Sequence, residues 1–313
     1  MAKIATREAY GKALVEFGAN PDIVVMDADL SKSTYTALFK KAYPERHINM
    51  GIAEANMMSA AAGLSSCGKT VFASTFAIFA SERAIEQVRN SICYPALNVK
   101  VCASHAGLSI GEDGASHQVV EDIAIMRALP NMRVISPCDA TETRLAIKYV
   151  LETPGPFYVR LGRLAVESVY EEGDCPFEFG RGIRLRDGND LTIVATGLMV
   201  QESLKAVELL KEKGISARLI DMHTIKPIDR DILAEAARET GLIVTAEEHT
   251  VIGGLGSAVA EALAQTVPCR MAMVGVQDRF GKSGKPADVL AEYGLTAANI
   301  AATAERLYAT KQG

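Results

Sequence analysis

The sequence predicts an α/β protein built from two doubly wound parallel-sheet domains. Short segments that are apolar throughout alternate with longer segments of helical periodicity, and this alternation occurs in both halves of the chain. Strands that are apolar on both faces indicate a parallel sheet covered by helices on each side. The alternation is interrupted once, between about residues 166 and 190, and 313 residues are enough for two domains of ordinary size.

The first domain is predicted to span residues 1–168. Its expected helices cover residues 7–18, 56–66, 80–92, 117–128 and 139–151, and its expected strands cover residues 21–26, 70–74, 97–104, 132–136 and 156–161. Asp139 stands at the start of one of these helices, where an aspartate side chain can cap free backbone N–H groups.

Residues 169–189 are predicted to form a linker with an antiparallel edge hairpin, because acidic residues, glycines and arginines replace the regular pattern there. The second domain then spans residues 190–313. Its expected strands cover residues 191–196, 217–222, 242–247 and 270–276, and its expected helices cover residues 199–213, 229–239, 255–264 and 297–308. In this half, His249 is expected to make either a core hydrogen bond or an interface contact.

Composition argues against several classes of function. The chain is 49% hydrophobic and 23% charged, and its net charge of −5 gives no electrostatic case for binding nucleic acid or an anionic membrane. We expect no membrane span and no signal peptide, because no apolar run is long enough. The six cysteines are scattered, which predicts reduced thiols in a cytoplasmic protein and no metal site built from them.

Polar loops follow several strands of the first domain, at residues 27–33, 75–79, 105–117 and 160–163. Ligands bind beyond the carboxyl ends of parallel strands, so these loops are the expected location of a site. Glu54 lies between small apolar residues just before a helix, and no residue beside it in the sequence looks able to pair with it. Such a carboxyl group could share a proton with a ligand nitrogen, or it could simply complement the helix dipole.

The loop at residues 105–117 carries the strongest single signal. Its glycines permit tight turns and close approach of a ligand, and histidines stand at both of its ends. His117 is expected at the start of a helix, where the dipole favours a neutral imidazole that can bond a substrate hydroxyl. Two alternatives are a pair of surface histidines and a metal site of His105, Asp113 and His117, although their spacing is unlike a helical pair of histidine ligands.

Phe76 and Phe79 lie three residues apart. In a first helical turn the two rings would share a face and could hold a flat heteroaromatic ring, although such a pair taken alone is more often part of a core.

Several motifs, in this order, resemble those of the transketolases. They are Asp29-Leu30, residues 51–54, Thr75-Phe76 with Phe79, residues 111–114 with His117-Gln118, and residues 130–132 with 137–139. Residues 247–249 and 253–257 resemble the carboxy-terminal domain shared by enzymes that use thiamine diphosphate. The resemblance covers the whole chain, which looks like the pyrimidine-binding and carboxy-terminal domains of a transketolase.

The resemblance implies a role for each candidate residue. Glu54 would hydrogen-bond a ring nitrogen of the aminopyrimidine of thiamine diphosphate and, with His117, would be catalytic. Phe76 and Phe79 would form the platform for the pyrimidine, and Asp29 would lie near the cofactor. Asp113 and His117 would contact the hydroxyls of a ketose, and the sugar phosphate would be bound by His105, Arg7, Ser33 and Arg160.

The chain departs from the family pattern in two places. A third ring of the aromatic cluster is replaced by Glu82, and the motif that binds the diphosphate and Mg²⁺ is absent. We therefore expect a separate N-terminal subunit to supply the diphosphate and Mg²⁺ ligands. The resemblance further implies a dimer of this chain and a heterotetramer with the partner.

The favoured function is the second subunit of a two-chain transketolase, which moves a two-carbon ketol unit from a ketose phosphate to an aldose. Three alternatives remain open: the beta subunit of a 2-oxoacid dehydrogenase, an enzyme like deoxyxylulose-phosphate synthase, and a non-catalytic regulatory subunit. The sequence does not name the ketose, and branched or sulfonated sugars would use the same residues.

Overall fold

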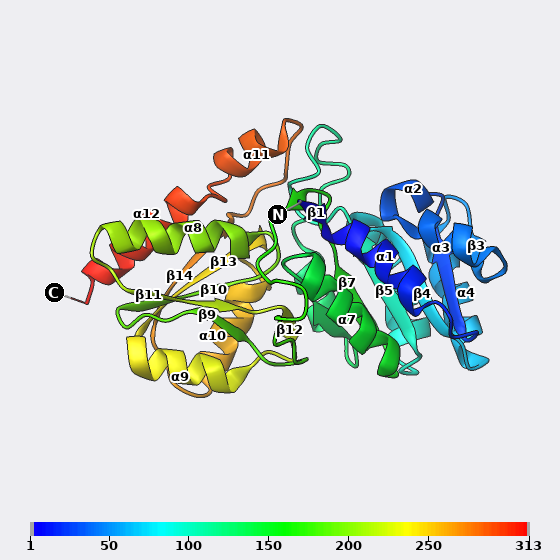
Figure 1. Cartoon of the computed structure of the whole chain (residues 1–313), viewed down its shortest axis with the longest axis horizontal. Coiled ribbons are helices and arrows are strands. Elements are labelled where there is room, and N and C mark those ends of the chain that lie inside the picture. The colour runs from blue at the N-terminus through cyan, green and yellow to red at the C-terminus, as the bar shows by residue number, and fades with distance from the viewer. Residues whose placement is uncertain (1–2, 312–313) are drawn as a thin grey trace.

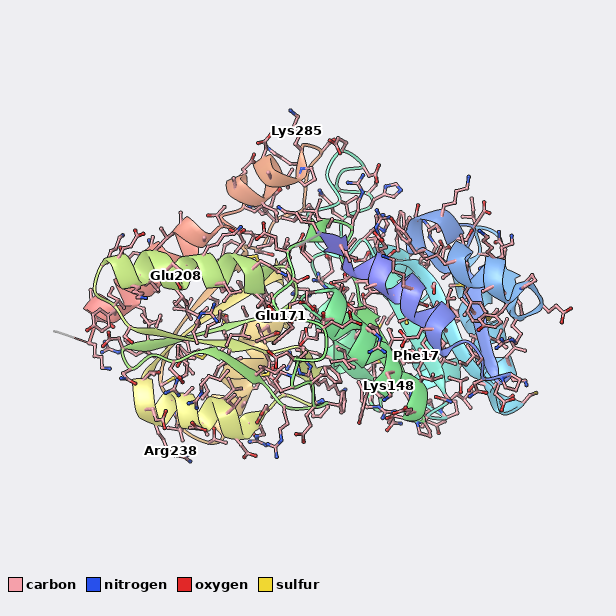
Figure 2. The ribbon with its side chains drawn as sticks, viewed as in Figure 1. Phe17, Lys148, Glu171, Glu208, Arg238 and Lys285 are labelled. Atoms are coloured by element: carbon pink, nitrogen blue, oxygen red, sulfur yellow. The ribbon has the colours of Figure 1, made fainter. Side chains whose placement is uncertain are left out.

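Two mostly parallel β-sheets lie side by side along the long axis of the molecule, and each is covered by helices on both faces (Figure 1). The computed structural model describes residues 3–311. The prediction of an α/β protein with two doubly wound sheets is confirmed. Charged side chains such as Glu208 and Arg238 project outward from the covering helices (Figure 2).

The first sheet has seven strands in the order β12-β6-β7-β5-β4-β2-β3. The strands are β2 (Ile23–Asp27), β3 (His47–Asn49), β4 (Thr70–Phe76), β5 (Val99–Ser104), β6 (Arg133–Ile135), β7 (Phe157–Arg160) and β12 (Thr224–Lys226). All neighbours are parallel except β12, which runs antiparallel to β6. The carboxyl ends of the six parallel strands therefore meet at one edge, which is where a ligand is expected.

Alternating residues of these strands face two separate cores. Val25 and Phe72 face α1 (Thr6–Phe17), α3 (Thr36–Ala42) and α7 (Ala140–Glu152). Met26 and Ala73 face α4 (Glu54–Ser66), α6 (Asp122–Ala128) and the segment of residues 79–93. That segment contains α5 (Ile85–Gln87) between two π-helical turns, Phe79–Arg83 and Val88–Cys93. Two short strands, β1 (Ile4–Ala5) and β8 (Ala165–Val166), pair with each other. The other short elements of this half are α2 (Ser31–Thr34) and the 3₁₀ turn Pro44–Arg46.

The second sheet has five strands in the order β14-β13-β10-β11-β9. They are β9 (Ile183–Arg186), β10 (Leu191–Ala195), β11 (Ala217–Asp221), β13 (Leu242–Thr250) and β14 (Arg270–Val276), and only β9 is antiparallel to its neighbour. In Figure 1, α8 (Met199–Glu212) and α12 (Ala297–Ala309) lie on one face of this sheet, with α9 (Arg230–Thr240) and α10 (Leu255–Ala264) on the other. The short helix α11 (Pro286–Glu292) follows β14.

Two expectations about connections are wrong. Residues 169–189 contain no hairpin, because the one strand there that joins a sheet, β9, pairs with β11. The first sheet also takes β12 from the second half of the chain. β6 would otherwise expose unpaired backbone groups at the sheet edge, and β12 covers them.

No helix in the described part of the chain combines the length and the apolar character needed to cross a membrane.

Candidate active site

A cluster of four rings lies beyond the carboxyl ends of β4 and β5. Phe76 is the last residue of β4, and His105 directly follows β5. The rings of Phe76 and His105 are stacked with centroids 3.8 Å apart, and those of Phe76 and Phe79 are nearly parallel at 5.9 Å. The ring of His117 meets Phe79 edge-on at 5.6 Å. Phe76 therefore lies at a strand end and not in a first helical turn as expected, yet its ring stacks with Phe79.

Glu54 is the first residue of α4, and its side chain is only 2% exposed. Its Oε2 atom lies 3.1 Å from Nη1 of Arg83. The guanidinium carbon of Arg83 also lies 4.2 Å from the centroid of the Phe79 ring. No residue beside Glu54 in the sequence supplies this partner; the π-helical turn Phe79–Arg83 instead brings an arginine that is distant in sequence to the carboxylate.

His105 is held as a neutral imidazole. Its Nε2 atom lies 3.4 Å from Nη1 of Arg7, which can only donate, so Nδ1 carries the hydrogen and donates to Ser104 Oγ at 2.9 Å. Burial, together with the positive charges of Arg7 and Arg163, lowers the pKa of His105 to about 3. A neutral ring is therefore present at His105, at the start of the loop.

Two arginines flank His105. Arg7 donates from Nη1 to the carbonyl of Ser33 at 2.7 Å and from Nε to the carbonyl of Arg163 at 3.3 Å. Arg163 donates to the carbonyl of Ile110 at 2.8 Å. The structure thus brings Arg7, Ser33 and His105 together as expected and adds Arg163, which the sequence analysis did not single out. Arg163 could have been found from the sequence, because it is the second arginine of the polar loop at residues 160–163.

Arg160 does not lie where the sequence analysis placed it. Its guanidinium is buried and binds Asp122 through two hydrogen bonds of 2.8 and 3.1 Å, and it also donates to the carbonyl of Glu248 at 2.9 Å. Burial opposes the charge, but Asp122 outweighs it and raises the pKa of Arg160 above its ordinary value. Arg160 therefore joins the two domains and is not available to a sugar phosphate, which corrects the expected role.

Asp29 and Asp113 are both exposed. Asp29 exchanges hydrogen bonds with Asn49, at 3.1 Å to its backbone N–H and 3.0 Å to its carboxylate. Asn49 Oδ1 also accepts from the N–H of Gly51 at 2.9 Å, so Asp29 helps to fix the turn that leads to Glu54. Asp113 lies in a turn in which the N–H of Gly114 donates to the carbonyl of Gly111 at 3.2 Å.

The expectation that His117 begins a helix is wrong, because α6 starts at Asp122. His117 lies in a turn, with its backbone N–H bonded to the carbonyl of Gly114 at 3.0 Å. No helix dipole therefore acts on its imidazole.

The second domain holds the loop at residues 105–117 in place. Glu248 Oε1 accepts from the N–H of Ser109 at 2.6 Å. Gln118 donates from Nε2 to the carbonyls of Leu108 and Lys282, both at 3.0 Å. The position of the loop thus depends on the contact between the two domains.

A cavity of about 530 Å³ opens beside the ring cluster. Its walls include Phe79, Arg83, Glu82 and Glu121, together with Phe280 from the second domain. Burial and the neighbouring Glu121 carboxylate raise the pKa of Glu82. Glu82 therefore supplies a carboxyl group to the pocket where the family pattern has a ring.

One buried group among the described residues has the composition of a metal site: Cys138, Glu142 and Asp221, whose ligand atoms lie within 4.8 Å of one another. Burial raises the pKa of Asp221 to about 6 and that of Glu142 well above its usual range. Tyr170 donates to Asp221 Oδ2 at 2.8 Å. Carboxyl groups that keep a proton can bond each other, so this group needs no cation to be stable.

Comparison with known proteins gives a consistent result. The family model for the transketolase pyrimidine-binding domain matches residues 2–168, and the model for the transketolase C-terminal domain matches residues 180–300. A putative transketolase C-terminal section of Methanocaldococcus jannaschii is 52% identical over 298 residues, covering 94% of this chain and 93% of that protein. A 6-deoxy-6-sulfo-D-fructose transketolase subunit of a Clostridium species is 41% identical over 302 residues, covering 96% and 94%.

Among solved structures, a split-gene transketolase described as an inactive beta4 tetramer superposes with a TM-score of 0.92 at 57% identity, covering 98% of this chain and 99% of that one. Human transketolase is 39% identical over 298 residues, which cover 94% of this chain but only 47% of the human protein. The chain thus spans about half the length of this one-chain relative. It belongs to the transketolase family, of which it contains the pyrimidine-binding domain and the C-terminal domain.

Proposed function

We propose that this chain is the C-terminal subunit of a two-chain, thiamine-diphosphate-dependent transketolase that transfers a two-carbon ketol unit from a ketose phosphate to an aldose. One observation carries the proposal. Glu54, a buried carboxylate at a helix N-terminus, bonds Arg83, whose guanidinium lies over the Phe79 ring of the stacked Phe76–Phe79 pair at the carboxyl edge of a parallel sheet. Family membership supports the coarser statement that the chain belongs to a thiamine-dependent transferase.

The residues present fit the aminopyrimidine half of the cofactor. A planar, cationic guanidinium already bonds Glu54 and stacks on Phe79, so this place accepts a flat group with N–H donors. When bound, thiamine diphosphate supplies the carbanion chemistry of ketol transfer. Glu54 would accept a hydrogen bond from the pyrimidine ring and hold its proton, while Phe76 and Phe79 would orient the ring.

The substrate phosphate would bind between Arg7 and Arg163. Both guanidinium groups flank the neutral His105, and within residues 3–311 none of these three side chains has a carboxylate as a hydrogen-bond partner. Arg163 takes the role first given to Arg160. Asp113 and His117, on the loop whose end residues His105 and His117 belong to the ring cluster, would bond the hydroxyls of the ketose.

The diphosphate and Mg²⁺ would be held by a separate N-terminal subunit, because the sequence has no diphosphate motif. We propose a heterotetramer of two copies of each chain, located in the cytoplasm, where the six cysteines would stay reduced. Two relatives name unusual sugars, 6-deoxy-6-sulfo-D-fructose and apulose 4-phosphate, so we propose that the donor is one of a class that includes such variants.

The test is an assay of the chain mixed with its N-terminal partner, thiamine diphosphate and Mg²⁺. We expect ketol transfer from xylulose 5-phosphate, sulfofructose or apulose 4-phosphate to an aldose phosphate. Decarboxylation of pyruvate without any ketol transfer would favour a 2-oxoacid dehydrogenase subunit or a relative of deoxyxylulose-phosphate synthase. Turnover that is unchanged after Glu54→Gln would favour a non-catalytic subunit.

A further inference from the structure

The guanidinium of Arg83 lies between Glu54 and the cavity. Arg83 lines the cavity and its side chain is 50% exposed, whereas Glu54 behind it is 2% exposed and is not among the described residues that line the cavity. Arg83 contacts the same two groups that the proposed function assigns to the pyrimidine: the Glu54 carboxylate at 3.1 Å and the Phe79 ring at 4.2 Å.

An arginine suits this position for a chemical reason. A guanidinium is flat and delocalised, presents N–H donors in its own plane, and stacks on aromatic faces. A protonated aminopyrimidine has the same features. One planar cation that bonds Glu54 and lies on Phe79 leaves no room for a second one with the same two contacts.

We propose that Arg83 is a displaceable cover of the cofactor site, which occupies the place of the pyrimidine in the cofactor-free chain and moves aside when the cofactor binds. This inference rests on the proposed function. Arg83 keeps the buried Glu54 carboxylate paired until the cofactor arrives, since an unpaired buried charge would be costly. The cofactor must therefore compete with a side chain of the protein for Glu54.

The same cavity offers Arg83 a second position. Glu82 and Glu121 both line it, and neither is among the acids that form an ion pair in the described part of the chain. Burial and Glu121 raise the pKa of Glu82, so a cation placed between these two carboxyl groups would be favoured. In this second position Arg83 would leave Glu54 to the pyrimidine and would relieve the repulsion between Glu82 and Glu121.

The test measures cofactor affinity and thermal stability. If Arg83 had only a structural role, its removal would weaken both. Calorimetry gives the Kd of thiamine diphosphate, with Mg²⁺, for the complex of this chain with its N-terminal partner. Thermal unfolding gives the Tm of the chain alone. For Arg83→Met we expect a Kd about fivefold lower, because the competitor is gone, and a Tm lower by about 1–3 °C, because Glu54 has lost its partner.

Three controls sharpen the result. Arg89→Met removes an exposed arginine of the same segment whose side chain, among the residues that the structure describes, bonds only its neighbour Asn90, and it should change neither quantity. Magnesium pyrophosphate, which has no pyrimidine, should bind wild type and Arg83→Met equally. Arg83→Lys keeps the charge but not the planar fork, so its Kd should lie between those of wild type and Arg83→Met.

A Kd that rises in Arg83→Met would overturn the inference, because it would show that Arg83 clamps the bound cofactor. An unchanged Kd would also overturn it. A wild-type complex that binds no thiamine diphosphate at all would overturn the proposed function as well, so the two failures are distinguishable.

Discussion

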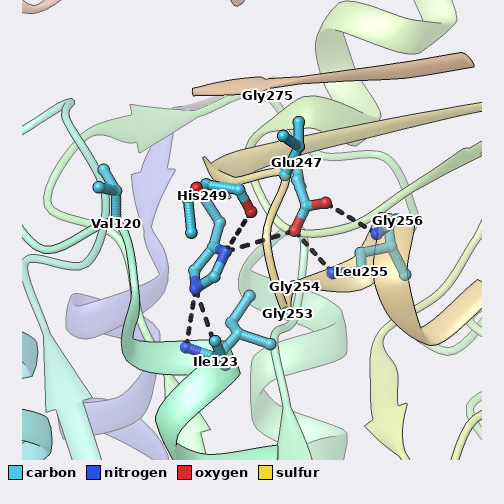
Figure 3. A network of polar contacts seen from close by, with 12 residues as sticks. Val120, Ile123, Glu247, His249, Gly253, Gly254, Leu255, Gly256 and Gly275 are labelled. Atoms are coloured by element: carbon cyan, nitrogen blue, oxygen red, sulfur yellow. Dashed lines mark hydrogen bonds and ion pairs between the residues drawn. The ribbon is translucent and has the colours of Figure 1, made fainter. Parts of the chain in front are cut away.

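The Nε2 atom of His249 lies 3.1 Å from the backbone nitrogen of Ile123, so a side chain of the second domain caps helix α6 of the first (Figure 3). The backbone N–H of Ala124 donates to the same atom at 3.3 Å, and His249 Nδ1 donates to the carbonyl of Thr250 at 2.7 Å. The two bonds that Nε2 accepts require the neutral ring, because a protonated Nε2 cannot accept. His249 is thus an interface contact between the two domains of one chain, and burial lowers its pKa to about 4.

His249→Gln should make the chain less sensitive to acid. The folded chain binds no proton at His249 until the pH approaches 4, whereas the unfolded chain binds one near pH 6.5. Stability from this group is therefore complete above pH 6.5 and is lost as the pH falls from there towards 4. The loss at pH 5 is about 2 kcal/mol. Glutamine can still accept from the helix N–H groups but does not titrate.

Urea unfolding at pH 7.5 and pH 5 would measure this difference. Between these pH values the free energy of unfolding should fall by about 1–2 kcal/mol less in His249→Gln than in wild type. If the free energy of unfolding fell equally in both proteins, His249 would not be a neutral cap of helix α6.

Arg160→Leu should destabilise the fold strongly. Asp122 is fully buried and would lose its two bonds to the guanidinium, which leaves an unpaired charge at a cost of about 3–5 kcal/mol. Asp122→Leu in the same chain should recover part of this loss, since the stranded charge is then gone. Urea unfolding of both variants would measure the recovery. Equal stability of Arg160→Leu and wild type would show that the ion pair with Asp122 does not stabilise the fold.

Arg163→Met should act on the substrate and not on the fold. Arg163 is only half-buried, and the one side-chain hydrogen bond that it makes within the described part of the chain goes to a backbone carbonyl. In the assembled enzyme we expect the KM for a phosphorylated donor to rise about tenfold or more, because charge-assisted bonds to the phosphate are lost. A donor without the phosphate should show almost no change. A similar rise in KM with both donors would show that Arg163 does not bind the phosphate.

Glu54→Gln should lower kcat by two to four orders of magnitude, because the amide cannot hold a proton for the bound ring. The matched control is Glu86→Gln on α5, where the exposed carboxylate bonds Gln87 and Asn90 and no other described residue. The measurement is ketol transfer by the complex with the N-terminal subunit. Glu54→Gln that retains more than a tenth of the wild-type kcat would argue against proton sharing at this carboxylate.

Sequence periodicity predicted the helices and strands whose ends depend on residues nearby in the sequence. The helix at α7 begins after Asp139, which accepts from the N–H of Glu142 as a cap should. The start of α6 was missed because residues 117–121 are held in turns by distant parts of the chain: Gln118 donates to the carbonyl of Lys282 at 3.0 Å, and the N–H of Thr250 donates to the carbonyl of Val120 at 2.6 Å. β12 was missed for a similar reason, since its partner β6 lies some 90 residues earlier in the chain.

In the candidate site, too, features set by topology could be predicted from the sequence, and features set by distant contacts could not. The loops at strand ends could be found from the sequence, because topology alone brings them to one edge. The partners of individual charges could not. Arg83 reaches Glu54 only through the irregular turn at Phe79–Arg83. Arg160 is buried because it pairs with Asp122, the first residue of α6, which lies 38 residues earlier in the chain.

Gly107→Ala should damage the site through the loop that carries His105 and His117. Gly107 has a φ of +82°, and a Cβ there would lie 2.3 Å from Cδ of the buried Glu248. Glu248 would have to move away from the N–H of Ser109, so we expect a loss of about 1–3 kcal/mol in unfolding free energy together with lower activity.

Gly63→Ala is the matched control. Gly63 lies within α4, where a Cβ would meet nothing within 4 Å, so the same substitution should stabilise the chain by about 0.5–1 kcal/mol. Urea unfolding of the two variants side by side would measure changes of opposite sign. If Gly107→Ala were as stable as wild type, the loop would have to be able to shift without losing its contact with Glu248, and the second domain would no longer be needed to position it.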